Sequence, residues 1–270
     1  MINIEPIKAF NDNYIWLVTT NEGSIVIDPG ESANLINFID LNKYKLEAIL
    51  ITHHHFDHTG GINDLITRDA IDVYGPNNNI DLINKRLREG DKVSIIGLEF
   101  EILEVPGHTL DHIAYYCKNN GSPILFSGDT LFSGGCGRVF EGTYQQMYKS
   151  IKKLKNLPKN TQIYCGHEYT ISNLEFAKTV EPFNKDIISS YNNALNLQHN
   201  NIPTLPTFLS SELKINPFLR VDDDNFLKSV GISSNNVSES FGILEHMQRN
   251  FILTDIMKTG DHRSYEQFID

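Results

Sequence analysis

The chain has 270 residues, ten histidines and a formal net charge of −11 at pH 7. This acidic balance excludes a nucleic-acid surface, which would show basic clusters, and no apolar run approaches the ~20 residues that cross a bilayer. We therefore expect small-molecule partners, no nucleic acid and no membrane. The length suits a catalytic domain with a smaller domain appended to it.

The N-terminus and the cysteines indicate the cellular compartment. Residues Met1 to Tyr14 lack the charged start and the apolar stretch of a signal peptide. Cys117, Cys136 and Cys165 are odd in number, far apart and outside C-x-x-C spacing, which is typical of a reducing compartment. We expect a cytoplasmic protein and a monomer.

Strand-like apolar runs alternate with turn signals over the first two thirds of the chain. Asp28-Pro29-Gly30 is a turn, after which residues 31–41 have helical apolar spacing. A second helix is predicted over 144–157, with its apolar residues on one face, and it ends before Pro158. The strands are expected over 14–19, 24–28, 47–52, 71–74, 99–105, 112–117, 123–127 and 162–165.

The strand signal fades near residue 170, and helical patterns take over from Glu181 onward. Periodicity by itself therefore indicates a mixture of α and β structure. We predict two domains, a catalytic domain over residues 1–169 and a mostly helical domain over 170–270.

Five potential metal ligands follow the strand-like run at 47–51. Residues 52–61 read Thr-His-His-His-Phe-Asp-His-Thr-Gly-Gly. In an extended chain alternate residues point the same way, so His53 and His55 share a side and His54 faces the other. Two imidazoles with an open coordination position suit a hydrolytic Zn²⁺, and the Asp57-His58 pair suits a second metal beside it.

Three further strand-like runs end in a glycine that is followed by an ionisable residue, namely His108, Asp129 or His167. Because sites in open α/β sheets lie where strands end, the four loops can converge on one point. Two bound ions would hold a hydroxide between them, since metal coordination lowers the pKa of water to about 7. The first metal set is His53, His55 and His108, the second is Asp57, His58 and His167, and the bridge is Asp129.

The metal itself is not determined by these residue types. Histidine and aspartate ligands accept Zn, Fe or Mn. We expect two divalent metal ions per chain, with zinc as the first choice and iron and manganese left open.

Several of these motifs resemble those of a known superfamily. T-H-H-H-F-D-H-T-G-G, P-G-H-T at 106–109 and S-G-D-T-L-F at 127–132 are similar to the metal-binding motifs of the metallo-β-lactamase superfamily. Residues 132–138, F-S-G-G-C-G-R, and 166–170, G-H-E-Y-T, resemble more selectively the bacterial hydroxyacylglutathione hydrolases, or glyoxalase II. The resemblance implies an α/β protein with an αββα sandwich and a smaller helical C-terminal domain that carries part of the substrate pocket.

The resemblance also implies a reaction. The family hydrolyses S-(2-hydroxyacyl)glutathione thioesters, such as S-D-lactoylglutathione, to glutathione and a 2-hydroxy acid such as D-lactate. The metal-bridging hydroxide would attack the thioester carbonyl, and a metal would stabilise the resulting oxyanion. Asp57 is expected to orient that hydroxide or accept its proton, which is the catalytic role we assign beyond metal binding.

Three residues are candidates for substrate binding on the same grounds. Arg138 stands where the family has a basic residue for a glutathione carboxylate, and its planar donors suit that group. Tyr169 is placed to donate to the peptide backbone of glutathione. Phe140 stands at a position often held by Tyr in eukaryotic relatives, so a hydroxyl contact is absent there.

The C-terminal region departs from the family. Bacterial relatives carry a segment of the form R-x-x-K-D-x-F, whose Arg and Lys meet the glycine carboxylate of glutathione. Aligning the aromatic ends places it at residues 245–251, where Glu245 and Gln248 replace both basic residues. A charge-assisted hydrogen bond is worth roughly 1.5–3 kcal/mol, so we expect glutathione thioesters to bind about ten- to a hundredfold more weakly.

Two other function classes remain open. A persulfide dioxygenase of the same superfamily would use one iron held by two histidines and an aspartate, and the second set of Asp57, His58 and His167 argues against it. A protein with purely structural metals is disfavoured because structural zinc sites are usually closed cages rich in Cys. Other hydrolases of this fold share the metal chemistry, so only the substrate-facing loops favour the thioester.

Overall fold

The computed structural model describes residues 2–119, 121–234 and 236–259, with side chains through residue 254. The chain divides into two compact units. Unit 1 draws on residues 1–105, 111–128 and 162–167, and unit 2 on residues 106–110, 129–161 and 168–270. Each unit is assembled from separate stretches of the chain, and we describe each by itself.

Unit 1 contains a mixed sheet with the strand order β1-β2-β3-β4-β5-β6. The first three strands pair antiparallel, and β3 to β6 run parallel to one another. The sequence pattern missed β1, an edge strand in which Pro6 is tolerated because an edge strand need not donate every ladder bond. The strands are β1 (Asn3–Ala9), β2 (Asn13–Thr20), β3 (Gly23–Ile27), β4 (Leu46–Leu50), β5 (Asp72–Pro76) and β6 (Lys85–Leu87).

A second sheet in unit 1 has the order β13-β10-β9-β8-β7. Its neighbouring strands pair antiparallel, except for the parallel pair of β10 and β13. The short strand β7 and its hairpin partner β8 are joined at Ile96-Gly97, both with positive φ. The strands are β7 (Lys92–Ile95), β8 (Leu98–Glu104), β9 (Ile113–Cys117), β10 (Ile124–Gly128) and β13 (Gln162–Cys165).

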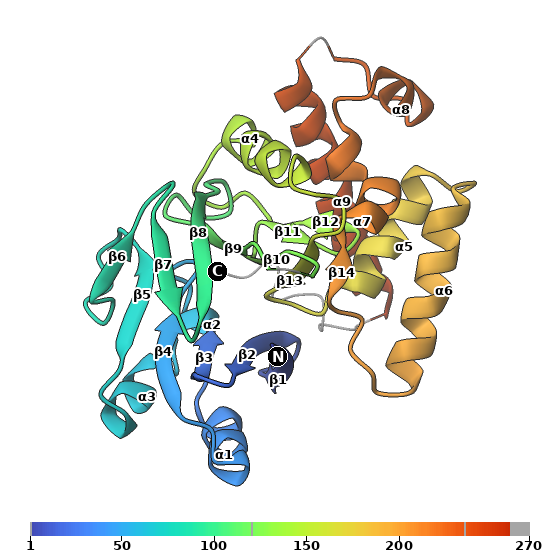
Figure 1. The fold of residues 1–270 in the computed structure, drawn as a ribbon. Helices are drawn as coiled ribbons and strands as arrows, with labels where there is room; N and C mark the ends of the chain where they lie inside the picture. The colour runs from blue at the N-terminus through green and yellow to red at the C-terminus, as the bar shows by residue number, and fades with distance from the viewer. Residues whose placement is uncertain (1, 120, 235, 260–270) are drawn as a thin grey trace. The chain divides into compact units, whose positions relative to one another are not determined.

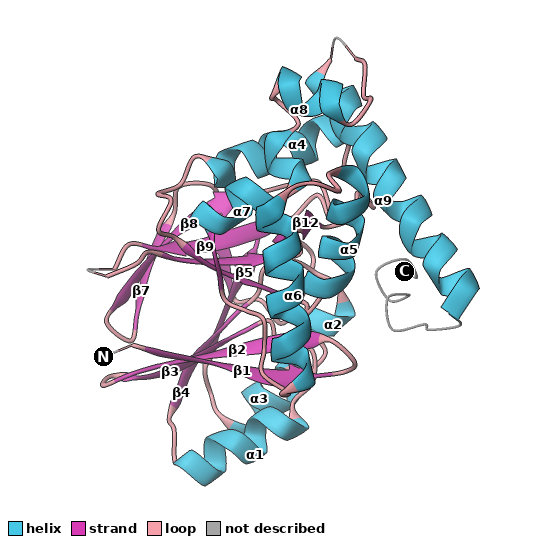
Figure 2. Ribbon diagram, turned by 90° about the vertical axis from the view of Figure 1, so that its right-hand side faces the viewer, coloured by secondary structure: helices cyan, strands magenta, loops and turns pink. Residues whose placement is uncertain are grey.

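The two sheets of unit 1 pack face to face, and helices cover the outer face of the first. Successive side chains of a strand point to opposite faces. In β2, Ile15 and Leu17 join the core under α1 (Ala33–Asn42) and α3 (Ile62–Arg68), which lie along that sheet in Figures 1 and 2. Trp16 points the other way and meets the ring of Tyr164 edge-on at 5.0 Å. The short helix α2 (Phe56–Thr59) follows β4.

Unit 2 is mainly helical (Figure 1). Thr143 and Gln146 form a reciprocal capping box at the start of α4, and the helix ends at Lys155, two residues before the predicted end. A core that includes Leu174, Ile187 and Ile215 joins α5, α6 and α7. The elements are β11 (Leu131–Phe132), β12 (Gly135–Cys136), α4 (Tyr144–Lys155), α5 (Thr170–Val180), α6 (Lys185–His199), β14 (Thr207–Phe208), α7 (Leu209–Ile215), the 3-10 helix η1 (Pro217–Arg220), α8 (Asp224–Ser229) and α9 (Val237–Thr259).

The helical character of unit 2 after residue 170 agrees with the sequence pattern. Residues 260–270 of the predicted C-terminal domain lie outside the described residues. Within the described part of the chain, no helix is both long and apolar enough to cross a membrane.

Candidate metal centre

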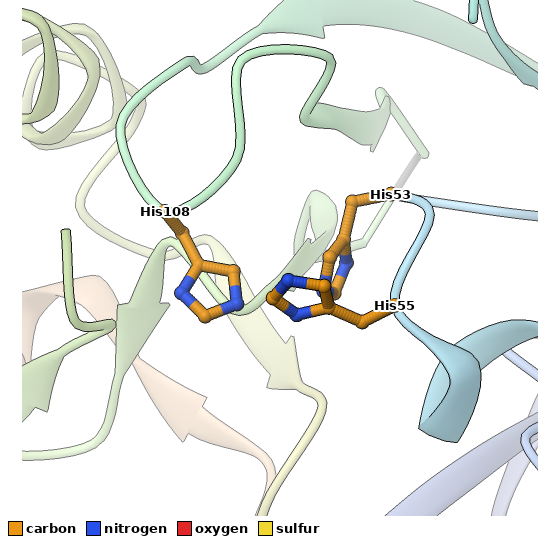
Figure 3. Close-up of side chains that lie close together, drawn as sticks. All are labelled: His53, His55 and His108. Atoms are coloured by element: carbon orange, nitrogen blue, oxygen red, sulfur yellow. The ribbon is translucent and has the colours of Figure 1, made fainter. Parts of the chain in front are cut away.

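The segment after β4 carries four of the predicted ligands of unit 1. Its start is held by Asp28, which accepts hydrogen bonds from the Thr52 amide (2.8 Å) and the Thr52 hydroxyl (2.7 Å). The rings of His53 and His55 lie 4.7 Å apart, and Figure 3 shows both leaving this segment, drawn together with His108 of unit 2. His54 instead has its Nδ1 2.9 Å from a carboxylate oxygen of Asp111.

Three of the predicted ligands lie together within unit 1. One ligand atom each from Asp57, His58 and His167 falls within 4.8 Å of the other two. Oδ2 of Asp57 lies 3.4 Å from Nε2 of His58 and 3.3 Å from Nε2 of His167. Residues separated by more than a hundred positions therefore meet in the segments that follow β4 and β13.

Carboxylates outside this set determine which histidine nitrogen faces it. Nδ1 of His58 lies 3.0 Å from Oδ2 of Asp28, and Nδ1 of His167 lies 2.8 Å from Oδ1 of Asp12. The contact at His167 is a hydrogen bond, which favours the tautomer with the proton on Nδ1 and leaves the lone pair on Nε2 free to bind a metal. The donor set is thus chemically suited to a divalent cation.

The surroundings of Asp57 favour its ionised form. Burial acts to raise the pKa of this carboxyl, but the charges that His58 and His167 carry when both rings are protonated, together with their hydrogen bonds in that state, outweigh it. The net effect places the pKa of Asp57 far below its ordinary value. Asn13 also donates a 2.8 Å hydrogen bond to Oδ2, so the carboxylate is oriented as well as ionised.

Unit 2 contains two further predicted ligands, His108 and Asp129. Nε2 of His108 lies 3.6 Å from Oδ2 of Asp129, and both residues are buried. Nδ1 of His108 lies 2.9 Å from the backbone oxygen of Arg138, so its Nε2 is again the nitrogen turned toward a carboxylate. Gly137 is required beside this pair, because a Cβ there would lie 1.8 Å from the backbone oxygen of Asp129.

The three predicted substrate residues also lie in unit 2. The guanidinium of Arg138 lies 4.6 Å from the ring centre of Phe140, and that ring lies 5.3 Å from the ring of His108. Tyr169 is buried and meets the ring of Phe132 edge-on at 5.3 Å. Arg138 and Phe140 are therefore next to a candidate ligand within the same unit.

The C-terminal segment that departs from the family pattern, residues 245–251, lies on α9. Glu245 is 5% exposed and accepts a 3.3 Å hydrogen bond from the hydroxyl of Tyr144. Burial raises its pKa, while the charges of Arg249 and Arg138 act in the opposite direction. Gln248 is also buried and donates a 3.0 Å hydrogen bond to Oδ1 of Asn173.

Two family models together cover most of the chain. The model of the metallo-beta-lactamase superfamily matches residues 10–167, and that of the hydroxyacylglutathione hydrolase C-terminus matches residues 168–251. A hydroxyacylglutathione hydrolase of Nitrosomonas eutropha is 44% identical over 258 residues, which cover 93% of this chain and all of that protein. The protein of the same name from Klebsiella pneumoniae is 45% identical over 237 residues, covering 87% of this chain and 93% of that protein.

The chain belongs to the hydroxyacylglutathione hydrolase family. It also belongs to the metallo-beta-lactamase superfamily, and the expectation drawn from the motifs is confirmed. The α/β fold with a helical C-terminal domain is confirmed by the same matches.

Solved structures share this fold. ETHE1 from Myxococcus xanthus aligns with a TM-score of 0.63 and 24% identity, over 93% of this chain and 90% of that chain. At that identity the match shows the fold alone. TTHA1623, in a di-iron-bound form, aligns with a TM-score of 0.57 and 26% identity, over 80% of this chain and all of that chain. In the present protein, the fold and the His/Asp clusters together indicate two divalent metal ions.

Sequence reasoning missed the residues that hold the ligands in place. Asp12, Asn13 and Asp28 contact ligand side chains, yet the sequence pattern indicated only a turn at Asp28. The sequence signal at Asp28 was weak, because a turn by itself does not indicate a functional role. In the structure Asp28 adopts a φ of +53°, a region that non-glycine residues seldom occupy and that occurs more often at functional sites.

Proposed function

We propose that this family member is a metal-dependent thioester hydrolase that converts S-(2-hydroxyacyl)glutathione, such as S-D-lactoylglutathione, to glutathione and a 2-hydroxy acid, such as D-lactate. The observation that carries the proposal is the set of Asp57, His58 and His167, whose Nε2 and carboxylate atoms face one another inside a chain of this family. Relatives of this name cover most of the chain, which supports the substrate class.

We assign the metal ligands as the sequence predicts. The first ion would be held by His53, His55 and His108, the three side chains drawn in Figure 3. The second would be held by Asp57, His58 and His167, with Asp129 shared between the two ions. We propose zinc for both positions. Two such ions would polarise the thioester carbonyl and lower the pKa of the attacking water.

Asp57 is the residue we propose for proton handling. Asn13 holds its carboxylate at 2.8 Å, and the carboxylate faces two ligand nitrogens. It can therefore orient the attacking water while the water oxygen bonds to the carbonyl carbon, or accept the proton of that water once metal coordination has lowered the pKa of the water. The carbon–sulfur bond then breaks, and glutathione leaves as a thiolate. A thiolate is a good leaving group, so the reaction needs no dedicated acid.

Arg138, Phe140 and Tyr169 are the proposed substrate-binding residues. The guanidinium of Arg138 suits a glutathione carboxylate, and Phe140 stacks against it and limits its freedom. Tyr169 would donate its hydroxyl to the peptide backbone of glutathione. We propose that residues 1–169 form the catalytic domain and residues 170–270 the substrate-binding domain, in a cytoplasmic monomer. The two family models meet at residues 167 and 168, which supports this division.

The deciding experiment combines elemental analysis with a thioester assay on the purified protein. We expect two divalent metal ions per chain, hydrolysis of S-D-lactoylglutathione, loss of activity with a chelator and recovery with Zn²⁺. One metal ion in a fully active chain would contradict the dinuclear assignment. Oxygen consumption with glutathione persulfide, without thioester hydrolysis, would instead favour the dioxygenase.

A further inference from the structure

Strands β11 and β12 form a hairpin that carries two proposed functional residues of unit 2. Leu131 pairs with Cys136 and Phe132 with Gly135, so residues 133 and 134 form the turn. Asp129 precedes the hairpin, Arg138 follows it, and the Gly137 amide closes the base with a 3.2 Å bond to the Thr130 oxygen. The position of the hairpin thus determines where the shared metal ligand and the substrate arginine lie.

The tip of this hairpin is held by buried side chains of the helical segment. Glu212 of α7 accepts hydrogen bonds from the Ser133 hydroxyl at 2.9 Å and the Gly134 amide at 2.8 Å. Asn216 donates to the backbone oxygens of Phe132 (3.1 Å) and Gly135 (2.9 Å).

The two clamping side chains also support each other and are joined by a third. Nδ2 of Asn216 lies 3.3 Å from the Glu212 carboxylate, and Thr207 donates a further 2.8 Å bond to that carboxylate. Asn173 of α5 donates to the Ser133 oxygen at 3.0 Å and accepts from Gln248 of α9. The hydrogen bonds described from this group to the hairpin all reach residues 132–135, which are the turn and the strand pair next to it.

A buried carboxylate is an unfavourable choice if the site needs only to be filled. Glu212 and Asn216 are both fully buried, and burying a charge is costly unless hydrogen bonds satisfy it. Apolar residues of similar volume often stabilise a fold as well as buried polar groups do. Apolar side chains cannot fix the orientation of the turn, because they lack the directional hydrogen bonds that hold its backbone at one register and angle.

We propose that Glu212 and Asn216 are positioning residues, which fix the tip of the hairpin and thereby place Asp129 and Arg138 at its base. The inference rests on the proposed function, because that proposal assigns Asp129 to the metal ions and Arg138 to the substrate. It gives α7 a part in the catalytic geometry although neither residue belongs to the proposed metal or substrate set.

The test compares two substitutions at one position. In Glu212→Gln the amide oxygen can accept from Gly134 and Asn216, while the amide nitrogen donates to the Ser133 and Thr207 hydroxyls, which rotate to accept. In Glu212→Leu every one of these bonds is lost. Asp223→Ala is the control, because it removes the N-cap of α8 in the same unit and the capping bonds of Asp223 reach only the amides of Asn225 and Phe226.

Three readouts are needed on each isolated enzyme: hydrogen exchange of the peptide spanning residues 130–137, metal content per chain, and steady-state kinetics. Glu212→Leu should speed exchange in that peptide, lower the metal content and reduce kcat roughly ten- to a hundredfold, as expected for a small misplacement of reacting groups. Glu212→Gln should restore all three values to near wild type. Asp223→Ala should lower the Tm but leave the three values unchanged.

Contrary outcomes are equally specific. The proposal is wrong if Glu212→Leu leaves exchange and metal content unchanged, if Glu212→Gln is as impaired as Glu212→Leu, or if Asp223→Ala produces the same losses. If Glu212→Leu does not fold, Ser133→Ala decides, since it removes one hydroxyl donor and should raise exchange in the hairpin. Failure of the wild type to hydrolyse the thioester would refute the proposed function, while exchange and metal content would still test the clamp.

Discussion

At the scale of single residues, the outer carboxylates explain why particular nitrogen atoms are available for metal binding. Asp12 and Asp28 each contact the Nδ1 of a proposed ligand, His167 and His58 respectively. We expect Asp12→Ala to lower metal affinity or activity about ten- to a hundredfold, which is the usual effect of losing such a partner. Competition with a chelator measures the affinity, and Asp12→Asn, which keeps an acceptor oxygen, is the matched control. Unchanged affinity in Asp12→Ala would refute this role.

Asp129 is the residue that we propose as the shared ligand of the two metal ions. Only a carboxylate offers two oxygens to two ions at once, so Asp129→Ala should lose the pair and reduce activity by roughly a hundredfold or more. Elemental analysis of the variant reports the metal content directly. Two metal ions per chain in Asp129→Ala would show that another residue bridges the ions.

Glu245 places a negative charge near the proposed carboxylate-binding Arg138. Glu245→Gln keeps an oxygen that can accept from Tyr144 but removes the charge, so KM for S-D-lactoylglutathione should fall about three- to tenfold. The double variant Glu245→Arg with Gln248→Lys should lower KM further. In both variants kcat should stay nearly unchanged, as expected for uniform binding. A KM equal to that of the wild type in both would show that this part of α9 has no role in glutathione binding.

At the scale of elements, the loop after β12 depends on the close approach of two backbone segments. A Cβ at Gly137 would lie 1.8 Å from the backbone oxygen of Asp129, so Gly137→Ala must displace the chain that carries that ligand. We expect a lower metal content and a loss of activity of roughly a hundredfold. Gly121→Ala is the control, since its nearest neighbour would lie 3.4 Å away. Equal metal content in the two variants would contradict this account.

At the scale of the whole molecule, Glu212 links the stability of the fold to pH. Burial raises its pKa above 4.5 despite four hydrogen bonds, so the folded chain holds this proton more tightly than the unfolded chain. Its contribution to the free energy of unfolding is therefore greatest below pH 4.5 and falls as pH rises through the folded pKa. Glu212→Gln does not titrate, so its Tm relative to wild type should rise between pH 4.5 and neutrality. A constant difference across that range would contradict the assignment.

The sequence by itself determined the family and the candidate ligands. His53, His108 and Asp129 stand at the ends of apolar strand-like runs. Motifs of this kind are local, so they can be recognised without knowledge of the fold. Periodicity likewise predicted α4 and most strands of both sheets. It missed β1, where Pro6 and alternating polar residues weaken the strand signal at an edge.

The tertiary structure alone decided which atoms face the site and what holds them. The contacts of Asp12 with His167 and of Asp28 with His58 join residues that are remote in sequence and lie in segments that follow different strands. The clamp of Glu212 on Gly134 joins a helix to a turn 78 positions earlier. Such contacts depend on side-chain packing between distant segments, and neither hydrophobic periodicity nor a local motif encodes them.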